Sequence, residues 1–348
     1  MTTAVVETVH TSGWSAVAGS IDSLHAHTLR SAADDVGGVR LAVLNMVAAC
    51  IDRPGFELAT RVVTALGAHH PARAIVIKAD PESDAMVEAD VSLQRTAVGD
   101  YEVYTELIQL LVGGEPAFHL TSLITPLLIP DIPVDLWVVG APRLAQAFSE
   151  DAVELCDRII IDSGAYTDSR STLQLIAAQL NRHDLALRLA DIAWERTRVW
   201  RELTAQGFDP PAAHPLLWHI TDVDLRSAGS VPSSQAWLMA GWMASRLNWM
   251  DGRQPRISAM PAPATGVVDG DLVYARFRAR AGERHAAFAL ARDHDALHTA
   301  FEVDGTTVER TLPYNEPDVQ ELISRLMDEA REETIYPAAV LRAAALAQ

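Results

Sequence analysis

The chain has 348 residues, of which 49% are hydrophobic and 21% charged, values typical of a globular protein that is long enough for two domains. Its formal net charge of -18 at pH 7 argues against nucleic acid or an anionic membrane as partner, because both attract a clustered basic surface. The acidity instead indicates a protein that stays in solution, with a basic protein partner as the alternative.

Lysine and cysteine are both rare in this chain. Lys78 is the single lysine, and every other member of the 28 Lys and Arg is an arginine. It lies in the strand-like segment VIKAD, outside any glycine-rich loop, which excludes a Walker-type nucleotide site. Cys50 and Cys156 have no C-x-x-C or zinc spacing, so we expect buried, reduced thiols, and a redox pair has no support. No signal peptide is visible, and a cytoplasmic location is expected.

The first part of the chain predicts an N-terminal arm, residues 1–37, with one short helix, followed by a β-α-β unit. Residues 39–51 form a long apolar run, rich in β-branched side chains, which predicts a strand that ends at the turn signal Asp-Arg-Pro-Gly. Residues 56–66 have helical periodicity and stop before a glycine, and residues 73–80 predict the next strand. Two strands joined in this way pair in parallel through a right-handed crossover.

The segment 119–163 organises the first domain. Its apolar residues are interrupted by Pro126, Pro130 and Pro133, which break a long helix and exclude a membrane span. We expect a short helix that ends near Pro126 and then two strands without polar alternation, a pattern typical of strands covered on both faces. The sequence predicts an α/β domain over 38–166 with a mixed, mainly parallel sheet. The strands just described are 134–139 and 158–162, an edge hairpin is expected over 86–96 and 101–113, and a helix over 142–155.

After residue 166 the pattern changes to helices and then to short strands. A long helix is expected from 185 to 206 and another over 233–250, where Gly241 permits close approach to a neighbouring element. Four strands joined by turn signals then predict an antiparallel meander, which gives an α+β domain over 167–348. The four strands are 272–281, 284–293, 296–305 and 307–314, and further helices are expected around 173–180, 318–333 and 337–347.

Two places are candidate sites because of their position. Asp162 and Ser163 follow a buried parallel strand, at the edge where α/β sheets usually bind ligands. Arg198 and Arg201 share one helix face with Trp194, where a guanidinium can stack on the indole. We expect Trp194 in the core. The two arginines either pack against the α/β domain or contact a partner, and partner contact is favoured because Trp and Arg are enriched at binding hot spots.

Standard catalytic and metal-binding patterns are missing. The chain has neither a G-x-S-x-G elbow nor a G-x-G-x-x-G loop after its first strand. His294 and His298 have the spacing of a helical zinc pair but lie where a turn enters a strand. His214 and His219 would face opposite sides of an extended segment. We therefore expect no catalytic residue, no cofactor and no metal.

Six segments in a fixed order carry a family resemblance. They are VRLAVLNMVAACI, HHPARAIVI, HLTSLITPLLIPDIPVDLWVVG, DRIIIDS, DIAWERTRVWRELTAQGFDPP and AWLMAGWMASRLNW, and they run from about residue 39 to 249. No single segment is diagnostic. The ordered set resembles OpcA, the glucose-6-phosphate dehydrogenase assembly protein family of cyanobacteria and actinobacteria.

The resemblance implies a non-enzymatic partner that promotes assembly and allosteric activation of glucose-6-phosphate dehydrogenase, the first oxidative step of the pentose phosphate pathway. It leaves the oligomeric state of the chain itself open. Cyanobacterial members are associated with thiol redox control, whereas Cys50 and Cys156 match no redox motif. The alternative, argued from the residues, is an enzyme or a sugar-phosphate sensor that binds its ligand at Asp162 and Ser163.

Overall fold

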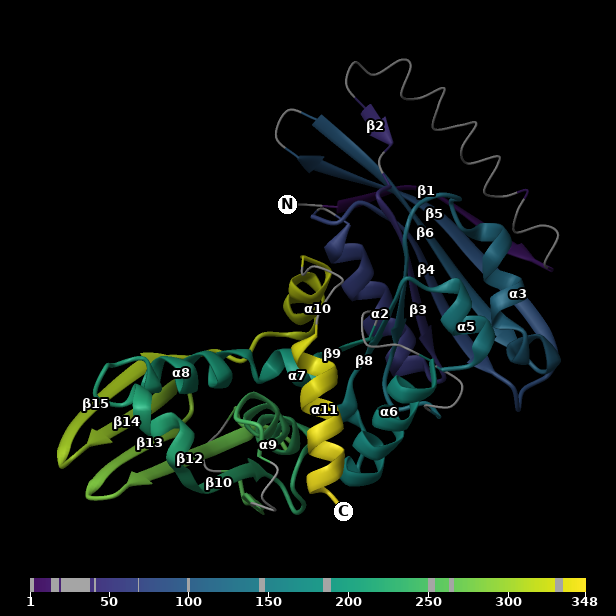
Figure 1. The fold of residues 1–348 in the computed structure, drawn as a ribbon. Coiled ribbons are helices and arrows are strands. Elements are labelled where there is room, and N and C mark those ends of the chain that lie inside the picture. The colour runs from purple at the N-terminus through teal and green to yellow at the C-terminus, as the bar shows by residue number, and fades with distance from the viewer. Residues whose placement is uncertain are drawn as a thin grey trace. The chain divides into compact units, whose positions relative to one another are not determined.

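The computed structural model divides the chain into two compact units (Figure 1). The first unit comprises Met1–Asp162, Arg188–Ala190 and Val319–Arg331, and the second comprises Ser163–Leu187, Asp191–Asp318 and Glu332–Gln348. The residues described are 3–13, 19, 38–40, 42–67, 69–98, 101–143, 148–183, 189–249, 254–262, 266–328 and 334–348.

The sheet of the first unit is mixed and mainly parallel, as the sequence predicts. Its strand order is β1-β5-β6-β4-β3-β7-β8-β9, and β2 also pairs with β6. Strands β3, β4, β6, β7 and β8 run parallel to their neighbours in this series, whereas β5 is antiparallel to both β1 and β6. The strands are β1 (Thr3–Ser12), β2 (Gly38–Arg40), β3 (Leu44–Cys50), β4 (Ala72–Asp80), β5 (Met86–Val98), β6 (Tyr101–Gly113), β7 (Val134–Val138), β8 (Arg158–Ile161) and β9 (Leu189–Asp191).

Helix α2 (Arg53–Leu66) packs its apolar stripe against β3 and β4. The helix begins at Asp52, whose side chain accepts a hydrogen bond of 2.7 Å from the Gly55 backbone N–H. The segment after β6 forms a 3-10 helix (Glu115–Phe118), helix α3 (Leu120–Ile124) and a second 3-10 helix (Thr125–Leu127). The short apolar helix ending near Pro126 is therefore confirmed, and the chain then enters β7.

The polar side chain of Asn45 holds this connection in place. Asn45 is fully buried in β3, and its amide donates to the Ile129 carbonyl at 3.0 Å and accepts from the Ile129 N–H at 2.9 Å. Arg73 pairs with the buried Glu106 at 2.7 Å and donates to the Leu127 carbonyl at 2.7 Å. Proline-rich backbone that lacks helix and sheet partners is thus satisfied by side chains of the neighbouring strands.

Three predictions for this unit need correction. Residues 3–12 of the arm form edge strand β1, because they pair with the exposed side of β5; the expected arm helix lies outside the described residues. Helix α5 is shorter than predicted, Glu150–Leu155, because Ser149 caps it by accepting from the Ala152 N–H. Helix α10 (Val319–Asp328), assigned to the domain 167–348, belongs to the first unit.

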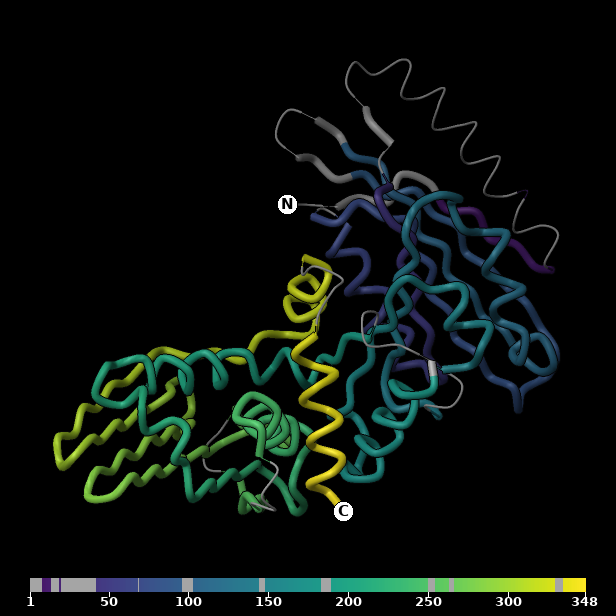
Figure 2. Tube along the Cα trace, viewed as in Figure 1, coloured from purple at the N-terminus to yellow at the C-terminus, as the bar shows by residue number. Residues whose placement is uncertain are grey.

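Contacts with α2 explain the placement of α10. Figure 2 shows α10, in yellow, beside α2, in dark blue. His70, just after α2, lies 2.9 Å from the Ser324 hydroxyl, and Arg158 of β8 donates to the Leu326 carbonyl. A helix from the last part of the chain therefore packs against α2 and reaches β8 in the first unit.

The second unit has a mixed sheet in the order β11-β10-β12-β13-β14-β15. The four predicted strands occur as antiparallel neighbours, β12 to β15, but the sheet is larger, because β10 joins antiparallel to β12 and parallel to β11. The strands are β10 (Ile220–Ala228), β11 (Arg256–Met260), β12 (Leu272–Ala281), β13 (Arg284–Arg292), β14 (Ala296–Val303) and β15 (Thr306–Pro313).

The prediction of one long helix over 185–206 is wrong. Leu189–Asp191 forms β9, and two helices follow, α7 (Ile192–Arg196) and α8 (Arg198–Phe208). The break has a local cause: Asp191 caps α7, and the Thr197 hydroxyl donates to the Trp194 carbonyl at 2.7 Å, which satisfies a backbone acceptor at the end of α7.

Helix α9 (Ser234–Arg246) crosses α11 (Ile335–Leu346) at very short range, and α6 (Ser169–His183) packs against α11 as well. A Cβ built on Gly241 would lie 2.2 Å from the Ala339 carbonyl oxygen and 2.7 Å from the Ala343 nitrogen. The expectation that Gly241 permits close approach is confirmed, because no larger side chain fits this crossing without a shift.

Candidate functional site

The predicted ligand position at Asp162 and Ser163 is filled by side chains of the protein, which bind the backbone of Ser163. Ser163 is fully buried just after β8. Its N–H donates to the Asp191 carboxylate at 3.0 Å, and its carbonyl accepts from the Ser234 hydroxyl at 2.8 Å. Asp162 is half-buried beside it. This arrangement favours a structural role for Ser163 over ligand binding.

Asp191 is the centre of this buried cluster. One carboxylate oxygen accepts from the N–H groups of Ser163 and Ala193, and the other accepts from the Tyr336 hydroxyl at 3.0 Å. The Trp194 ring lies 5.7 Å from the Tyr336 ring. A carboxylate that is fully buried costs free energy unless hydrogen bonds satisfy it, and here three donors do so.

Arg198 and Arg201, at the start of α8, contact α7 and the Thr197 residue that joins the two helices. Arg198 binds both oxygens of Glu195, at 2.6 and 2.7 Å, and the Glu195 side chain is 0% exposed. The Arg201 guanidinium lies 3.5 Å from the Trp194 ring centroid, so the predicted stacking is confirmed, and its Nε donates to the Thr197 hydroxyl. Trp194 is buried, as expected. These contacts within the chain are enough to explain where both side chains lie. Contact of the two arginines with a partner stays a proposal.

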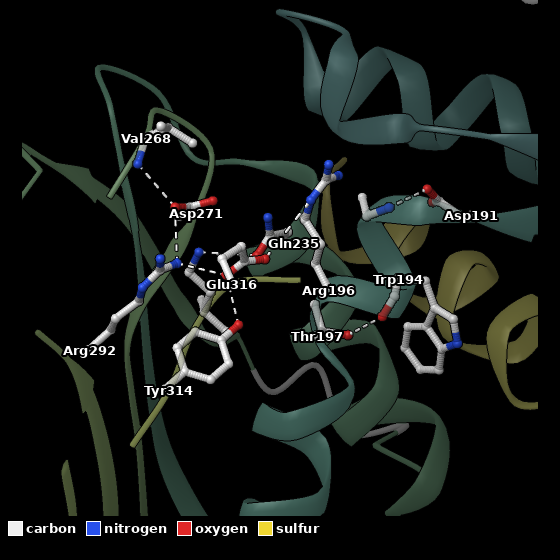
Figure 3. A network of polar contacts seen from close by, with 12 residues as sticks. Asp191, Trp194, Arg196, Thr197, Gln235, Val268, Asp271, Arg292, Tyr314 and Glu316 are labelled. Carbon is white, nitrogen blue, oxygen red and sulfur yellow. Dashed lines mark hydrogen bonds and ion pairs between the residues drawn. The ribbon is translucent and has the colours of Figure 1, made fainter. Parts of the chain in front are cut away.

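A second polar cluster, which the sequence did not indicate, surrounds Arg292 at the end of β13 (Figure 3). Its guanidinium is buried and binds the carboxylates of Asp271, at 3.0 Å, and Glu316, at 2.8 Å. The Tyr314 hydroxyl donates to the same Glu316 oxygen at 2.7 Å, and Arg292 lies over the Tyr314 ring. We call these four residues the Arg292 cluster.

The Arg292 cluster holds protons more tightly than exposed groups would. Burial raises the pKa of the Glu316 carboxyl, against the lowering effects of the Tyr314 hydrogen bond and Arg292. Burial, together with the Glu316 charge, also raises the pKa of Tyr314. A tyrosine with a raised pKa stays a hydrogen-bond donor at neutral pH. Through its hydrogen bonds and ion pairs, the cluster joins β13 to the segments 266–271 and 314–316.

The main cavity of the first unit lies on the other side of the parallel sheet from α2. Its volume is ≈ 330 Å³, in the range of small-molecule pockets. The floor is formed by residues of β3, β4 and β7, and the roof is formed by α3, α5 and the 3-10 helix before α3. The residues of the floor are Val47, Ala49, Cys50, Ala79, Leu136 and Val138, and the roof includes Phe118, His119, Leu120, Ser122, Ile124, Ala152 and Leu155.

The cavity lies along β3 and β7, and not after β8, where Asp162 and Ser163 were expected to bind a ligand. The chain leaves β3 toward β4 on one side and later returns to β7 on the other side of β3. Ligands bind α/β sheets at the carboxyl ends of strands at such a change of direction. The sequence did not identify the site because the order of the strands in space was unknown.

The lining of the cavity limits what it can bind. Its floor is aliphatic, and no arginine or lysine occurs among the described residues that line it. His119, Ser122 and Asp151 are among the polar groups near the roof. A phosphate would lose its hydration without a cation to replace it. The cavity therefore suits an uncharged, mainly apolar molecule and does not suit a sugar phosphate.

Both cysteines also line this cavity, and neither forms a disulfide. Burial, with a smaller effect of the Asp52 carboxylate, raises the pKa of the Cys50 thiol to about 12. In the sheet, Asn45 of β3 is level with Val134 of β7, and Asp135 of β7 is level with Arg158 of β8. Cys156 comes two residues before Arg158, so it lies level with the start of β3.

This register separates the two thiols. Cys50 is six residues further along β3, which puts the two cysteines about 20 Å apart along the strand direction. A disulfide requires Cα atoms within about 7 Å of each other. The folded first unit therefore does not permit a Cys50–Cys156 disulfide.

Neither a metal site nor a membrane span is indicated in the part of the chain that the structure describes. No group of three or more His, Cys, Asp or Glu side chains there could hold a metal ion. No described helix is long and apolar enough to cross a membrane. The fold and these clusters define a two-unit protein, an α/β unit with an apolar cavity and an α+β unit with a buried ionic cluster.

Comparison with known proteins assigns this class of protein to a family. A family model described as glucose-6-phosphate dehydrogenase subunit N-terminal domain matches residues 63–178, and one described as the C-terminal domain of that subunit matches residues 187–340. Between them they cover most of both units. The chain belongs to the OpcA family, as the ordered segments of the sequence indicated.

Curated relatives carry the same family name. Proteins of Synechocystis sp. and Nostoc punctiforme, both described as putative OxPP cycle protein OpcA, are each 28% identical over 193 residues, which is 54% of this chain. These matches cover 39% and 40% of the relatives, so the chain matches only about two fifths of their length. A crystal structure of aldose-aldose oxidoreductase from Caulobacter crescentus covers 88% of this chain and 98% of its own, at 9% identity and a TM-score of 0.38, too low to carry an argument.

Proposed function

We propose that this chain is a non-enzymatic partner of glucose-6-phosphate dehydrogenase that promotes its assembly and activates it allosterically, in the cytoplasm and within the oxidative pentose phosphate pathway. The observation that carries the proposal is the pair of family models, because both are described as domains of a subunit of this dehydrogenase. Together they include residues of both units, so both units are expected to serve the same complex.

The alternative is an enzyme or a sugar-phosphate sensor with its ligand at Asp162 and Ser163. Two observations weigh against it. Ser163 is fully buried and its backbone groups are bonded within the second unit. The cavity at the ends of β3 and β7 offers no arginine or lysine to a phosphate. We therefore retain the assembly factor as the proposed function.

Co-elution of separately purified proteins tests the proposal. The chain and the dehydrogenase from the same source are mixed and passed over a gel-filtration column at physiological salt. We expect one peak with both proteins and a larger mass than either alone. An unrelated acidic protein of similar size serves as the control, because a net charge of -18 could bind a basic surface without specificity. Separate elution of two folded proteins would contradict the proposal.

A further inference from the structure

One face of the sheet of the second unit is not covered by any helix among the described residues of that unit. Helices α8 and α9 and the 3-10 helix His214–His219 contact its strands, and the side chains on that side form the core. Val223, Phe277 and Phe288 belong to this core. The residues that alternate with them point to the opposite face, which we call the open face.

The middle strand of the open face is apolar where a solvated strand is usually polar. On β13 the outward positions are Ala287, Ala289 and Ala291, all half-buried, and Ala300 of β14 is level with Ala289. One face of an antiparallel sheet normally alternates with polar residues when water covers it. A strand that is apolar on both faces indicates a second layer above the alanines.

Charges of opposite sign lie on the two sides of this alanine column. Arg276 and Arg278 of β12 lie on one side, and Glu302 of β14 and Glu309 of β15 lie on the other. The Arg278 side chain is 55% exposed and the Glu302 side chain 41% exposed.

Basic residues also prevail further out on the β12 side. Arg226 and Arg256 lie on β10 and β11, together with Asp222 and Asp224, which pair with the arginines. With Arg280 of β12, five arginines therefore face two aspartates there, so the open face is basic on one side of β13 and acidic on the other.

We propose that the open face binds a second copy of this chain. A two-fold axis parallel to β13 would place the alanines of one copy on those of the other, and β12 of each copy over β14 of its partner. Arg278, Ala287 and Glu302 lie in one row across the sheet. The axis therefore brings Arg278 of each copy to Glu302 of the other, twice in the dimer. Alanine is small enough for sheets to pack about 10 Å apart.

The size of the open face sets the strength of this contact. Five strands about 4.8 Å apart, and three rows of outward side chains, cover roughly 500 Å² on each copy. The total of about 1,000 Å² lies below the usual size of a stable interface. The dimer is therefore expected to be weak and to form in the micromolar range or above, so the measurement needs high concentrations.

Sedimentation equilibrium of the full chain, up to about 500 µM at physiological salt, tests the proposal with a charge exchange. The wild-type chain is expected to dimerise. Arg278→Glu and Glu302→Arg each place like charges together and are expected to weaken the dimer at least about tenfold. The double variant exchanges both charges and is expected to return to within about threefold of the wild type.

Arg310→Glu is the matched control, because Arg310 lies on β15 level with the core-facing Thr299 and so projects from the helix-bearing face. It is expected to leave the dimer unchanged. The proposal would be overturned if the wild-type chain stayed monomeric or if neither single variant changed the dissociation constant of the dimer. It would also be overturned if the double variant dimerised more weakly than either single variant. Variants that lose binding to the dehydrogenase while the wild type never self-associates would overturn it as well, since the open face would then serve another partner.

Discussion

The sheets of the two units bury their strands in different ways. In the first unit, β3, β4 and β7 are buried almost completely, with α2 on one face and the roof of the cavity on the other. In the second unit, β15 is almost fully exposed, and a buried ionic cluster surrounds Arg292 at the sheet end. The difference indicates that helices and the cavity roof cover both faces of the first sheet, whereas the second sheet has its apolar core on one face and its unit depends in addition on a buried ionic cluster.

Arg292→Met tests this dependence, and we expect the largest loss of stability from it. The change leaves the carboxylates of Asp271 and Glu316 buried without their shared cation, which is expected to lower the free energy of unfolding by about 3–5 kcal/mol. Urea denaturation followed by tryptophan fluorescence measures it, because Trp200 and Trp249 lie in the core of the second unit.

Arg325→Met is the control for that variant. Its ion pair with Glu321 has side chains that are 41% and 55% exposed, so the expected loss is below about 1 kcal/mol. Equal losses in the two variants would show that the Arg292 cluster contributes no more than a surface pair.

The cavity of the first unit is tested by the reactivity of Cys50. With its pKa raised to about 12, the thiol has very little thiolate at pH 8. We expect alkylation by iodoacetamide to be slower by about three orders of magnitude than for an exposed cysteine. The Cys156→Ser variant isolates this thiol, and the same variant in urea gives the reference rate.

Oxidation of the wild-type chain provides a second measurement on these thiols. The register of β3, β7 and β8 keeps Cys50 and Cys156 apart, so the folded chain is expected to form no disulfide between them. Rapid alkylation of Cys50, or a Cys50–Cys156 disulfide formed without unfolding, would contradict the structure of the cavity.

Gly241→Ala tests packing in the second unit and should have a smaller effect. The added methyl meets the backbone of α11, whose Ala339 oxygen would be 2.2 Å away, so we expect a loss of about 1–3 kcal/mol. Gln174→Ala on the exposed side of α6 is the helix-surface control and should change stability by less than about 0.5 kcal/mol. A neutral Gly241→Ala variant would mean that α9 and α11 pack less closely.

The strands of the first sheet could be predicted from sequence because each has a clear apolar pattern. Residues 134–139 and 158–162 show no polar alternation, and they form β7 and β8. Strand β1 was missed because its segment TAVVETVHTS is polar enough for an arm, and its partner β5 lies about 80 residues away. The break before α7 was missed because Asp191 is fixed by Ser163 and Tyr336, which are distant in sequence.

The candidate site was predictable only in part. The rule that ligands lie at the carboxyl ends of parallel strands led to Asp162, after β8, whereas the cavity lies at β3 and β7. Strand order decides between these places, and an inserted hairpin, β5 and β6, hides that order in the sequence. The Arg292 cluster had no signal either, because its members come from separate strands and loops with no regular spacing.

The rate of the dehydrogenase itself tests the proposed function most directly. Purified glucose-6-phosphate dehydrogenase is assayed by reduction of its nicotinamide cofactor while this chain is added in increasing amounts, and the chain alone is assayed in parallel. We expect no activity from the chain alone and a dehydrogenase rate that rises and then saturates at a fixed ratio of the two proteins. A dehydrogenase rate that stays constant with the folded chain in excess, or steady turnover by the chain alone, would contradict the account.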